Sequence, residues 1–402
     1  MLLFLSAFFL VYGSLHWFFY RLLAAAWSPG RWRGPLLLFL LLMVLSPVLV
    51  RALERREMEG PALLLAHIGF TWMGFIFLFS VLALLLLPLR GLSAWRRAAA
   101  ADRLRLPGDR PGPGFRLASP RGTFVAAFLV AVAASAYGYW EARDIRLEQV
   151  RLDSPKMAGF APAITAGGAE EPAAWPPARP LRIVKITDLH LGLQIRERRL
   201  APVLELVRRA RPDILVATGD IVDGQGDGIA HLADQFRRLE APLGKFAILG
   251  NHEFYIGAAT AQNFLEEAGF TVLRGESIEI GGRLRIAGVD DRTGIMLGLT
   301  PPDQEERLLA GLAADTFNIL LKHQPAIEPG GVVDLQLSGH IHRGQIFPFN
   351  FFTWLAFRVP SGLSRTEDGR YLYVGRGAGT WGPPIRLLAP PEVTLLELGA
   401  EI

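Results

Sequence analysis

Five short apolar segments in the second half of the chain each end abruptly in polar residues that can bind a metal ion. Each segment has the length and composition of a buried β-strand. The segments are residues 183–186, 214–217, 246–249, 319–321 and 335–337. In an open α/β sheet, the loops at the carboxyl ends of the strands converge on one crevice. The pattern therefore predicts an α/β fold that brings the polar residues after these segments to a single site.

Eight of those polar residues have side chains that coordinate metals. They are Asp188, His190, Asp220, Asn251, His252, His323, His340 and His342. None is a thiolate, because the chain has no cysteine, and imidazole with carboxylate or amide oxygen suits manganese, iron or zinc. An octahedral ion takes about six ligands, whereas seven candidates remain when His252 is set aside. Two divalent ions divide this set more naturally than one.

Taken singly, such a motif is weak, because an Asp that ends a strand is more often a helix N-cap than a ligand. Together, Asp-x-His, Gly-Asp, Gly-Asn-His-Glu, a lone His and Gly-His-x-His resemble, in this order, the calcineurin-like metallophosphoesterases over about residues 181–398. Residues 187–192, 251–255 and 375–384 further resemble the bacterial membrane-associated YkuE/YaeI-like branch. The resemblance implies a four-layer αββα sandwich, with two mixed sheets face to face and helices outside, and a metal-dependent phosphohydrolase activity.

The resemblance also implies a role for each candidate residue. Asp220 bridges two ions, and three further residues complete each site: Asp188, His190 and His342 for one ion, and Asn251, His323 and His340 for the other. His252 is the catalytic residue and not a ligand. It faces the substrate and either protonates the leaving oxygen or stabilises charge on the transferring phosphoryl group, which suits an imidazole with a pKa of about 6.5. Glu253 either orients a ligand or is a solvated loop carboxylate.

The last motif departs from the branch, which commonly has Gly-His-Thr-His-Gly-Gly where this chain has Ile341 and Arg343. Arg343 is a candidate substrate-binding residue for a second phosphate or another anionic group, and a solvent-facing loop residue is the alternative. Residues 375–379 are rich in glycine but precede no predicted helix, so they predict a tight loop near the metals and not a nucleotide cradle. Three aromatic residues either wall a pocket or belong to the core: Phe254, Tyr255 and Trp381.

Residues 1–140 are predicted to form an all-α transmembrane region of about four helices. Crossing a bilayer takes about 20 apolar residues, and four apolar stretches approach or exceed that length: residues 2–20, 35–50, 61–87 and 123–140. The second is marginal, with a re-entrant or tilted segment as the alternative. The first is predicted to be an anchor and not a cleavable signal peptide, because no basic residue precedes it and no clear cleavage site follows it. Residues 141–180 follow as a first strand and connector, and residues 181–402 as the catalytic domain.

Arginine in the short loops predicts the orientation of these spans, because cytoplasmic loops carry an excess of basic residues. The loop after the third span holds most of them: Arg90, Arg96, Arg97, Arg103, Arg105, Arg110, Arg116 and Arg121. Both termini and the catalytic domain then lie on the extracytoplasmic face of a bacterial inner membrane. The proline and glycine in that loop predict irregular structure, which favours contact with anionic lipid headgroups over nucleic-acid binding.

Weaker patterns predict the remaining elements of the second half. Residues 141–156 alternate polar and apolar side chains with an offset at Glu148-Gln149, which predicts an edge strand with a bulge. Residues 157–180 are rich in alanine, glycine and proline and predict a surface connector. Apolar spacing predicts three helices and a strand at residues 200–207, 232–239, 264–268 and 284–289. Three histidines outside the motifs are assigned no catalytic part: His16, His67 and His231.

These features predict a membrane-anchored enzyme with two divalent ions that hydrolyses a phosphate mono- or diester. The reaction is direct attack by a metal-activated hydroxide, without a covalent enzyme intermediate. The tether favours a substrate near the outer membrane face, such as a lipid-linked or cell-envelope phosphate. A catalytically silent metal-binding scaffold or sensor with the same fold is the alternative, and the retained His252 argues against it. A transporter with an appended domain is disfavoured by the few intramembrane charges.

Overall fold

The computed structural model describes residues 2–103, 119–160, 162, 179–224, 228–327 and 331–400. These residues divide into two compact units. The helical unit comprises Met1–Tyr139 with Gly382–Ile385, and the sheet unit comprises Trp140–Trp381 with Arg386–Ile402. The proline- and glycine-rich part of the predicted basic loop and most of the predicted connector lie outside the described residues, at 104–118, 161 and 163–178.

The first half of the chain is helical, as its apolar stretches predict. Its elements are α1 (Leu2–Ala26), the 3-10 helix η1 (Gly30–Trp32), α2 (Arg33–Glu54), α3 (Glu59–Arg103) and α4 (Pro120–Glu141). Four helical stretches in the described residues are long and apolar enough to cross a bilayer: Leu5–Ala26, Gly30–Glu54, Glu59–Pro88 and Pro120–Glu141. The marginal stretch at 35–50 lies inside the continuous helix α2, so it also reaches the length of a span. Four such helices indicate a membrane protein.

The third helix is longer than its apolar stretch predicts. The sequence places a loop directly after residue 87, but α3 includes Pro88 and continues to Arg103. Four arginines assigned to the loop therefore lie in a helix: Arg90, Arg96, Arg97 and Arg103. The reason is intrinsic propensity, because residues 91–103 consist mostly of alanine and arginine, which are strong helix formers. The loss of hydrophobicity after residue 87 marks the end of the apolar stretch and not the end of the helix.

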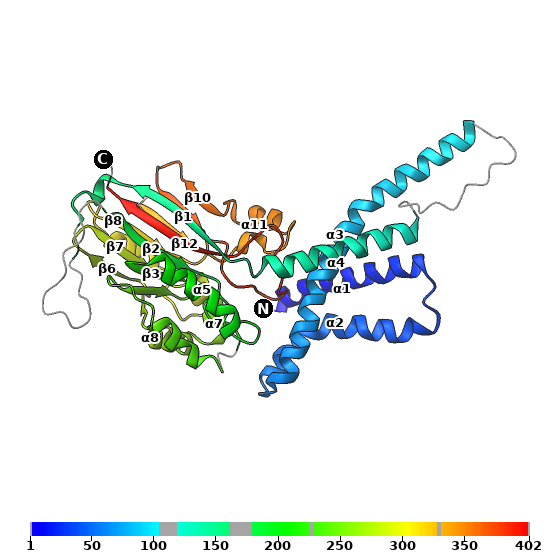
Figure 1. Cartoon of the computed structure of the whole chain (residues 1–402), viewed down its shortest axis with the longest axis horizontal. Helices are drawn as coiled ribbons and strands as arrows, with labels where there is room; N and C mark the ends of the chain where they lie inside the picture. The colour runs from blue at the N-terminus through cyan, green and yellow to red at the C-terminus, as the bar shows by residue number, and fades with distance from the viewer. Residues whose placement is uncertain are drawn as a thin grey trace. The chain divides into compact units, whose positions relative to one another are not determined.

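Two six-stranded sheets form the centre of the sheet unit (Figure 1). The first has the strand order β1 (Arg146–Asp153), β12 (Glu392–Gly399), β2 (Leu181–Ile186), β3 (Ile214–Thr218), β4 (Lys245–Ile248) and β5 (Thr271–Val272). The second has the order β10 (Gly362–Arg365), β11 (Tyr371–Val374), β9 (Leu335–Ser338), β8 (Phe317–Leu321), β7 (Leu284–Gly288) and β6 (Glu276–Ile280). Each sheet combines parallel pairs with antiparallel ones, so both are mixed.

Short helices connect these strands. The α-helices are α5 (Glu197–Ala210), α6 (Ala233–Arg237), α7 (Asn251–Ile256), α8 (Ala258–Glu267), α9 (Arg292–Met296), α10 (Gln304–Ala310) and α11 (Asn350–Phe357). The 3-10 helices are η2 (Pro155–Met157), η3 (Ala230–Leu232) and η4 (His342–Gly344). The elements α5, α6, α8 and β7 confirm the three helices and the strand that apolar spacing predicts.

Hydrophobic contacts on both faces of each sheet produce four layers. Successive side chains of a strand point to opposite faces, and β2 shows the consequence. Val184 belongs to a cluster with Leu204 of α5 on the outer face, whereas Ile183 belongs to a cluster with Ile286 of the second sheet. Side chains of α10 cover the outer face of the second sheet. The order of helix, sheet, sheet and helix confirms the predicted αββα sandwich.

Strand β1 is an edge strand, as predicted, but it has no bulge. Its eight residues pair one to one with β12, from Arg146 with Glu392 to Asp153 with Gly399. The offset in its apolar pattern has another cause. Leu147 packs against the outer cluster, whereas Val150 packs against the cluster between the sheets. The strand contributes apolar side chains to both faces, so a change of phase needs no extra residue.

Candidate active site

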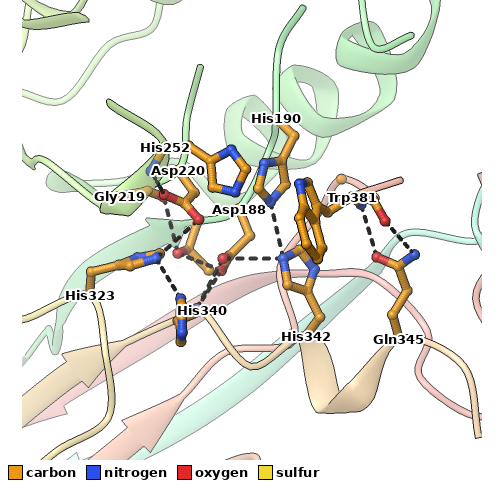
Figure 2. Close-up of polar contacts among 12 residues, drawn as sticks. Asp188, His190, Gly219, Asp220, His252, His323, His340, His342, Gln345 and Trp381 are labelled. Atoms are coloured by element: carbon orange, nitrogen blue, oxygen red, sulfur yellow. Dashed lines mark hydrogen bonds and ion pairs between the residues drawn. The ribbon is translucent and has the colours of Figure 1, made fainter. Parts of the chain in front are cut away.

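The polar residues after five strand ends converge on one site (Figure 2). The strands are β2, β3 and β4 of the first sheet and β8 and β9 of the second. Hydrogen bonds join the two sheets there: the backbone N–H of His340 donates to Asp188 Oδ1 at 2.9 Å, although the two residues are 152 positions apart. The loops at the carboxyl ends of the strands therefore meet, as the sequence pattern predicts.

Asp188, His190 and His342 form the first of two groups of side chains. The Nε2 atoms of His190 and His342 lie 3.0 Å apart, and the Nε2 of His342 lies 3.4 Å from Asp188 Oδ1. The two imidazole rings are stacked, with centroids 5.1 Å apart. All three side chains are buried. Two ring nitrogens and a carboxylate oxygen thus point at one small volume.

The second group surrounds the Nε2 of His323. Asp220 Oδ2 lies 3.1 Å from this nitrogen, and both Asn251 Oδ1 and His340 Nδ1 lie 3.2 Å from it. The other ring nitrogen of His323 contacts the carbonyl oxygen of Thr218 at 2.8 Å, which fixes the orientation of the ring. A backbone carbonyl on the far nitrogen is the usual partner of a metal-binding histidine, because it selects the tautomer that directs a lone pair to the metal.

Three groups among the described residues are placed to hold a metal ion, each with one ligand atom per residue, all within 4.8 Å of one another. They are Asp188 with His190 and His342, Asp220 with His323 and His340, and Asp220 with His190 and His252. The first two contain six of the seven residues that the sequence analysis divides between two ions, and the seventh, Asn251, lies 3.2 Å from His323. The roles of all seven as ligands stay predictions. Asp220 belongs to two groups, which is the position a bridging carboxylate needs.

The chemistry of this donor set fits divalent transition metals. Imidazole nitrogens and carboxylate or amide oxygens without thiolate suit manganese, iron or zinc. Histidine must be neutral to bind a metal. Burial, with a smaller contribution from the charge of neighbouring histidines, lowers the pKa of both His190 and His340 to about 4. Both rings are therefore neutral at neutral pH and have lone pairs available for an ion.

His323 and Asp220 form a buried ion pair. Burial alone would lower the pKa of His323, but the nearby carboxylate of Asp220 outweighs it and raises this pKa well above its ordinary value. The same contact holds the pKa of Asp220 well below its ordinary value, against the effect of its own burial. The pair therefore carries a proton on His323 that an incoming metal ion must displace.

Several site residues have a left-handed backbone. The φ angles are positive at Asp188, His190, Asp220, His340 and His342. Such a conformation costs an ordinary residue about 1–2 kcal/mol, although Asp and His adopt it more readily than most. The sharp turn directs each side chain from its strand end into the common volume. The fold thus maintains backbone strain at the positions that bring these side chains together.

Two glycines allow the loops to approach the site closely. A Cβ at Gly250 would lie 2.4 Å from Asp220 Oδ1. A Cβ at Gly377 would lie 2.7 Å from the Cβ of Asp188, and the φ of Gly377 is +77°. Any side chain at these positions would displace a carboxylate. This confirms the prediction that the glycine-rich loop at 375–379 is a tight loop next to the site.

Glu253 connects two of the loops. Its buried carboxylate accepts backbone N–H groups of Gly250 at 2.8 Å, Asp220 at 2.9 Å, Ile221 at 2.7 Å and Val222 at 3.1 Å. The alternative of a solvated loop carboxylate is therefore wrong, because the side chain is fully buried. Glu253 holds the loop after β3 against the start of α7, and so positions Asp220.

His252 has a partner that the sequence analysis missed. Its Nδ1 lies 2.9 Å from Asp223 Oδ1, and its backbone N–H donates to Asp220 Oδ1 at 2.9 Å. Burial would lower the pKa of His252, but the carboxylates of Asp220 and Asp223 raise it to about 9. The only signal for Asp223 in the sequence is a second carboxylate three residues after Asp220. Its partner follows 29 residues later, so only the folded loops reveal the pair.

Arg386 is a second residue that the sequence analysis missed. It is fully buried, it donates to the carbonyl oxygens of Gly379 and Ala389, and it lies 3.1 Å from the Nδ1 of His342. A guanidinium at this position opposes protonation of His342, whose pKa is lowered mainly by burial. No motif marks this arginine, because its partner lies 44 positions earlier.

The sequence analysis left three aromatic residues as either part of a pocket wall or part of the core, and the structure separates them. Phe254 is buried in the core, whereas Tyr255 and Trp381 are exposed and flank His252, with ring centroids 5.5 Å and 5.7 Å from it. The side chain of Arg343 is exposed next to His342. Its role in substrate binding stays a prediction.

The three remaining histidines contact residues that the sequence analysis assigns no part in catalysis. The Nε2 of His16 accepts the indole N–H of Trp72 at 2.9 Å. His67 contacts a backbone carbonyl one turn earlier in its helix, and His231 pairs with Glu197 at the surface. All three contacts are consistent with the absence of a catalytic assignment.

The fold and this site define a metal-dependent phosphohydrolase. A model of the family described as calcineurin-like phosphoesterase matches residues 181–344. A metallophosphoesterase of Aquifex aeolicus is 39% identical over 272 residues, which cover 67% of this chain and 97% of the relative. The chain therefore belongs to the calcineurin-like metallophosphoesterase family, whose members depend on two metal ions.

Two further relatives widen the comparison. The metallophosphoesterase YkuE of Bacillus subtilis is 36% identical over 233 residues, which cover 54% of this chain and 78% of YkuE. A transmembrane protein with a metallophosphoesterase domain from Bos taurus is 30% identical over 257 residues, which cover 60% of this chain and 57% of that protein. The similarity thus extends to a relative that is itself named as a transmembrane protein.

Proposed function

We propose that this chain is a membrane-anchored phosphoesterase in which seven residues hold two divalent metal ions and His252 is the catalytic residue. The proposed ligands are Asp188, His190, Asp220, Asn251, His323, His340 and His342. The observation that carries the proposal is the position of Asp220, whose carboxylate belongs both to the group with His323 and His340 and to the group with His190 and His252. Manganese, iron and zinc are the ions that fit this donor set.

The residues of the site have different roles in the hydrolysis of a phosphate mono- or diester. When bound, a pair of divalent ions supplies charge neutralisation for the phosphate oxygens and an activated water as the nucleophile. Asp220 sets the separation of the two halves of the site, and neutral Asn251 keeps the site net positive, so that it attracts an anionic phosphate. Asp223 engages the Nδ1 of His252 at 2.9 Å. His252 then presents its Nε2 to the leaving oxygen and donates a proton to it. None of these side chains forms a covalent bond to phosphorus.

The four apolar helices and the distribution of arginine support a location in the membrane. We infer that α1 to α4 anchor the chain in a bacterial inner membrane with the sheet unit on the extracytoplasmic face. The chain has no cysteine, so Glu367→Cys in the sheet unit introduces a unique thiol. A membrane-impermeant maleimide should label this variant in intact cells and should not label Ser28→Cys, which lies between the first two spans. The reverse pattern would contradict this orientation. A lipid-linked or cell-envelope phosphate is the substrate class that this location favours.

Hydrolysis of simple esters tests the proposed activity. The full chain, purified in detergent and loaded with Mn²⁺ or Zn²⁺, should hydrolyse an aryl phosphate monoester or a bis-aryl diester. A parallel sample treated with chelator should be inactive until metal is returned. Binding of metal without hydrolysis of either ester would overturn the enzyme proposal and support the scaffold or sensor.

A further inference from the structure

Helix α11 and the residues before it form an unusual surface of the sheet unit, which we name the α11 segment (residues 347–357). None of the eight residues of α11 is buried. Six large apolar side chains of the segment are between 47% and 58% exposed: Phe347, Phe349, Phe351, Phe352, Trp354 and Leu355. By contrast, α5 buries five of its residues against the first sheet. Large exposed apolar patches mark contacts with a membrane or a partner.

The α11 segment is attached directly to the active site. It begins shortly after η4, the 3-10 helix that contains the candidate ligand His342. At its other end, the ring of Phe357 lies 5.4 Å from the ring of His340, another candidate ligand. Between η4 and the start of the segment, Gln345 exchanges hydrogen bonds with the backbone of Trp381, at 3.0 Å and 2.9 Å. Any surface that binds the segment is therefore held close to the reacting phosphate.

The charged residues near the segment in the sequence favour binding to an anionic membrane surface. From residue 335 to residue 366 the sequence contains no Asp or Glu, but it contains Arg343, Arg358 and Arg365, and all three side chains are exposed. The guanidinium of Arg358 lies 5.2 Å from the ring of Trp354. Exposed Phe, Trp and Leu beside arginines, without acids, are typical of a helix that lies in the interface of an anionic bilayer, with its apolar side chains in the acyl region and its basic ones among the headgroups.

A bilayer is also available to this chain. Its first half contains four helices of membrane-spanning length and composition. The last of them ends at Glu141, and the first strand of the sheet unit begins at Arg146. A connection of so few residues tethers the sheet unit to any membrane that α4 crosses.

We propose that the α11 segment inserts into the headgroup and acyl boundary of an anionic bilayer, and that the active site thereby faces phosphates at the membrane surface. The biological role of this insertion rests on the proposed function, because an active site held at the membrane would hydrolyse lipid-borne phosphate. The physical claim of insertion is independent of catalysis and can be tested separately.

The absence of native cysteine permits the test on the full chain. Phe351→Cys and Leu355→Cys place a unique thiol in the segment, and Asn263→Cys places one on the exposed side of α8 as a matched helical control. Each variant is labelled with an environment-sensitive fluorophore and reconstituted in nanodiscs that contain phosphatidylglycerol with brominated acyl chains. Interfacial helices lie about 5–10 Å deep, so the labels at 351 and 355 should shift to the blue and lose roughly half of their emission or more. The label at 263 should change little.

Each other result contradicts the inference. Labels at 351 and 355 that behave like the label at 263 would show that the segment stays in water. A blue shift without quenching by brominated lipid would show that protein, such as a second copy of this chain, covers the segment. Equal quenching in phosphatidylcholine alone would overturn the preference for anionic lipid.

Hydrolysis of a soluble aryl phosphate, measured on the same nanodiscs, separates this inference from the proposed function. Quenching without hydrolysis would count against the proposed function alone. Hydrolysis without quenching would count against the inserted segment alone. Because both labelled side chains are exposed, their replacement should leave the thermal unfolding of the chain unchanged, and this measurement confirms that the variants are folded.

Discussion

The carboxylate of Asp223 lies 2.9 Å from the Nδ1 of His252, although Asp223 follows β3 and His252 lies in α7. The contact fixes the orientation of the imidazole and keeps a proton on Nδ1, so that in the proposed mechanism Nε2 is the nitrogen that faces the substrate. Under the proposed function, Asp223 is a positioning residue, which acts on the reaction only through the ring that it holds.

Asp223→Asn should therefore lower turnover without removing metal. Loss of an orienting partner of this kind typically costs about 10- to 100-fold, and we expect a decrease in kcat of that size with KM nearly unchanged. The acidic group on which activity depends should also titrate at lower pH, because a carboxylate that favours the charged imidazole is gone. Wild-type kcat with an unchanged pH profile would show that Asp223 has no role in positioning His252.

His252→Ala should have a larger effect on the same step. Removal of a general acid typically costs about 10²- to 10⁴-fold, and the metal content measured by mass spectrometry should stay at the wild-type value. His231→Ala is the matched control, because His231 lies on the surface of the same unit in a pair with Glu197. If metal and activity fall together in His252→Ala, the residue is a ligand or a structural element and not the proton donor.

The sequence predicts the fold of the second half well, because strands and helices there follow simple apolar periods. Val184 and Ile183 alternate between two cores, and Leu204 follows the period of α5. It also places the candidate ligands, because each comes directly after an apolar strand. It misses Asp223 and Arg386, because their roles depend on contacts with residues that are distant in the sequence.

Other features have no periodic signal in the sequence at all. The left-handed backbone at Asp188 and Asp220 is imposed by the loops around them. The α11 segment is apolar in composition, like a core element, and only the structure shows that its side chains are exposed. The bulge predicted in β1 illustrates the opposite error, since Leu147 and Val150 simply pack on different faces.

Glu253→Ala should destabilise the sheet unit. It would leave four buried backbone N–H groups without their carboxylate acceptor, among them those of Gly250 and Asp220. An unsatisfied buried donor costs about 1–3 kcal/mol, and with partial rearrangement of the loops we expect a loss of about 3 kcal/mol in total. Chemical denaturation of the wild type and the variant measures this difference, with Glu266→Ala on the surface of α8 as the control. Equal stabilities would show that water or another side chain replaces Glu253.

The buried side chain of Lys185 should make the free energy of unfolding depend on pH. Burial lowers its pKa to about 8, against the opposing effect of Glu392, and its buried Nζ has no hydrogen-bond partner among the described residues. The unfolded chain therefore binds more protons than the folded one between about pH 8 and pH 10.4, so stability contributed by this group rises with pH through that window. Lys185→Met removes the buried charge and should be more stable than the wild type at pH 7, by about 1–3 kcal/mol, because each unit of pKa shift corresponds to about 1.4 kcal/mol.

The advantage of Lys185→Met should shrink as the pH approaches 10. Thermal unfolding of both proteins in detergent at pH 7 and pH 9.5 checks this result. A variant that is less stable than the wild type by the same amount at both pH values would show that Lys185 is charged and well compensated in the folded state.

The most direct test of the account is a metal titration of the full chain. Protein stripped of metal by a chelator is titrated with Mn²⁺ at a protein concentration far above the dissociation constant, and hydrolysis of an aryl phosphate is followed at each addition. If Asp220 joins two ions in one centre, activity should rise to a plateau whose break lies at two ions per chain. A plateau at one ion per chain, or metal binding without hydrolysis, would contradict the two-metal phosphoesterase described here.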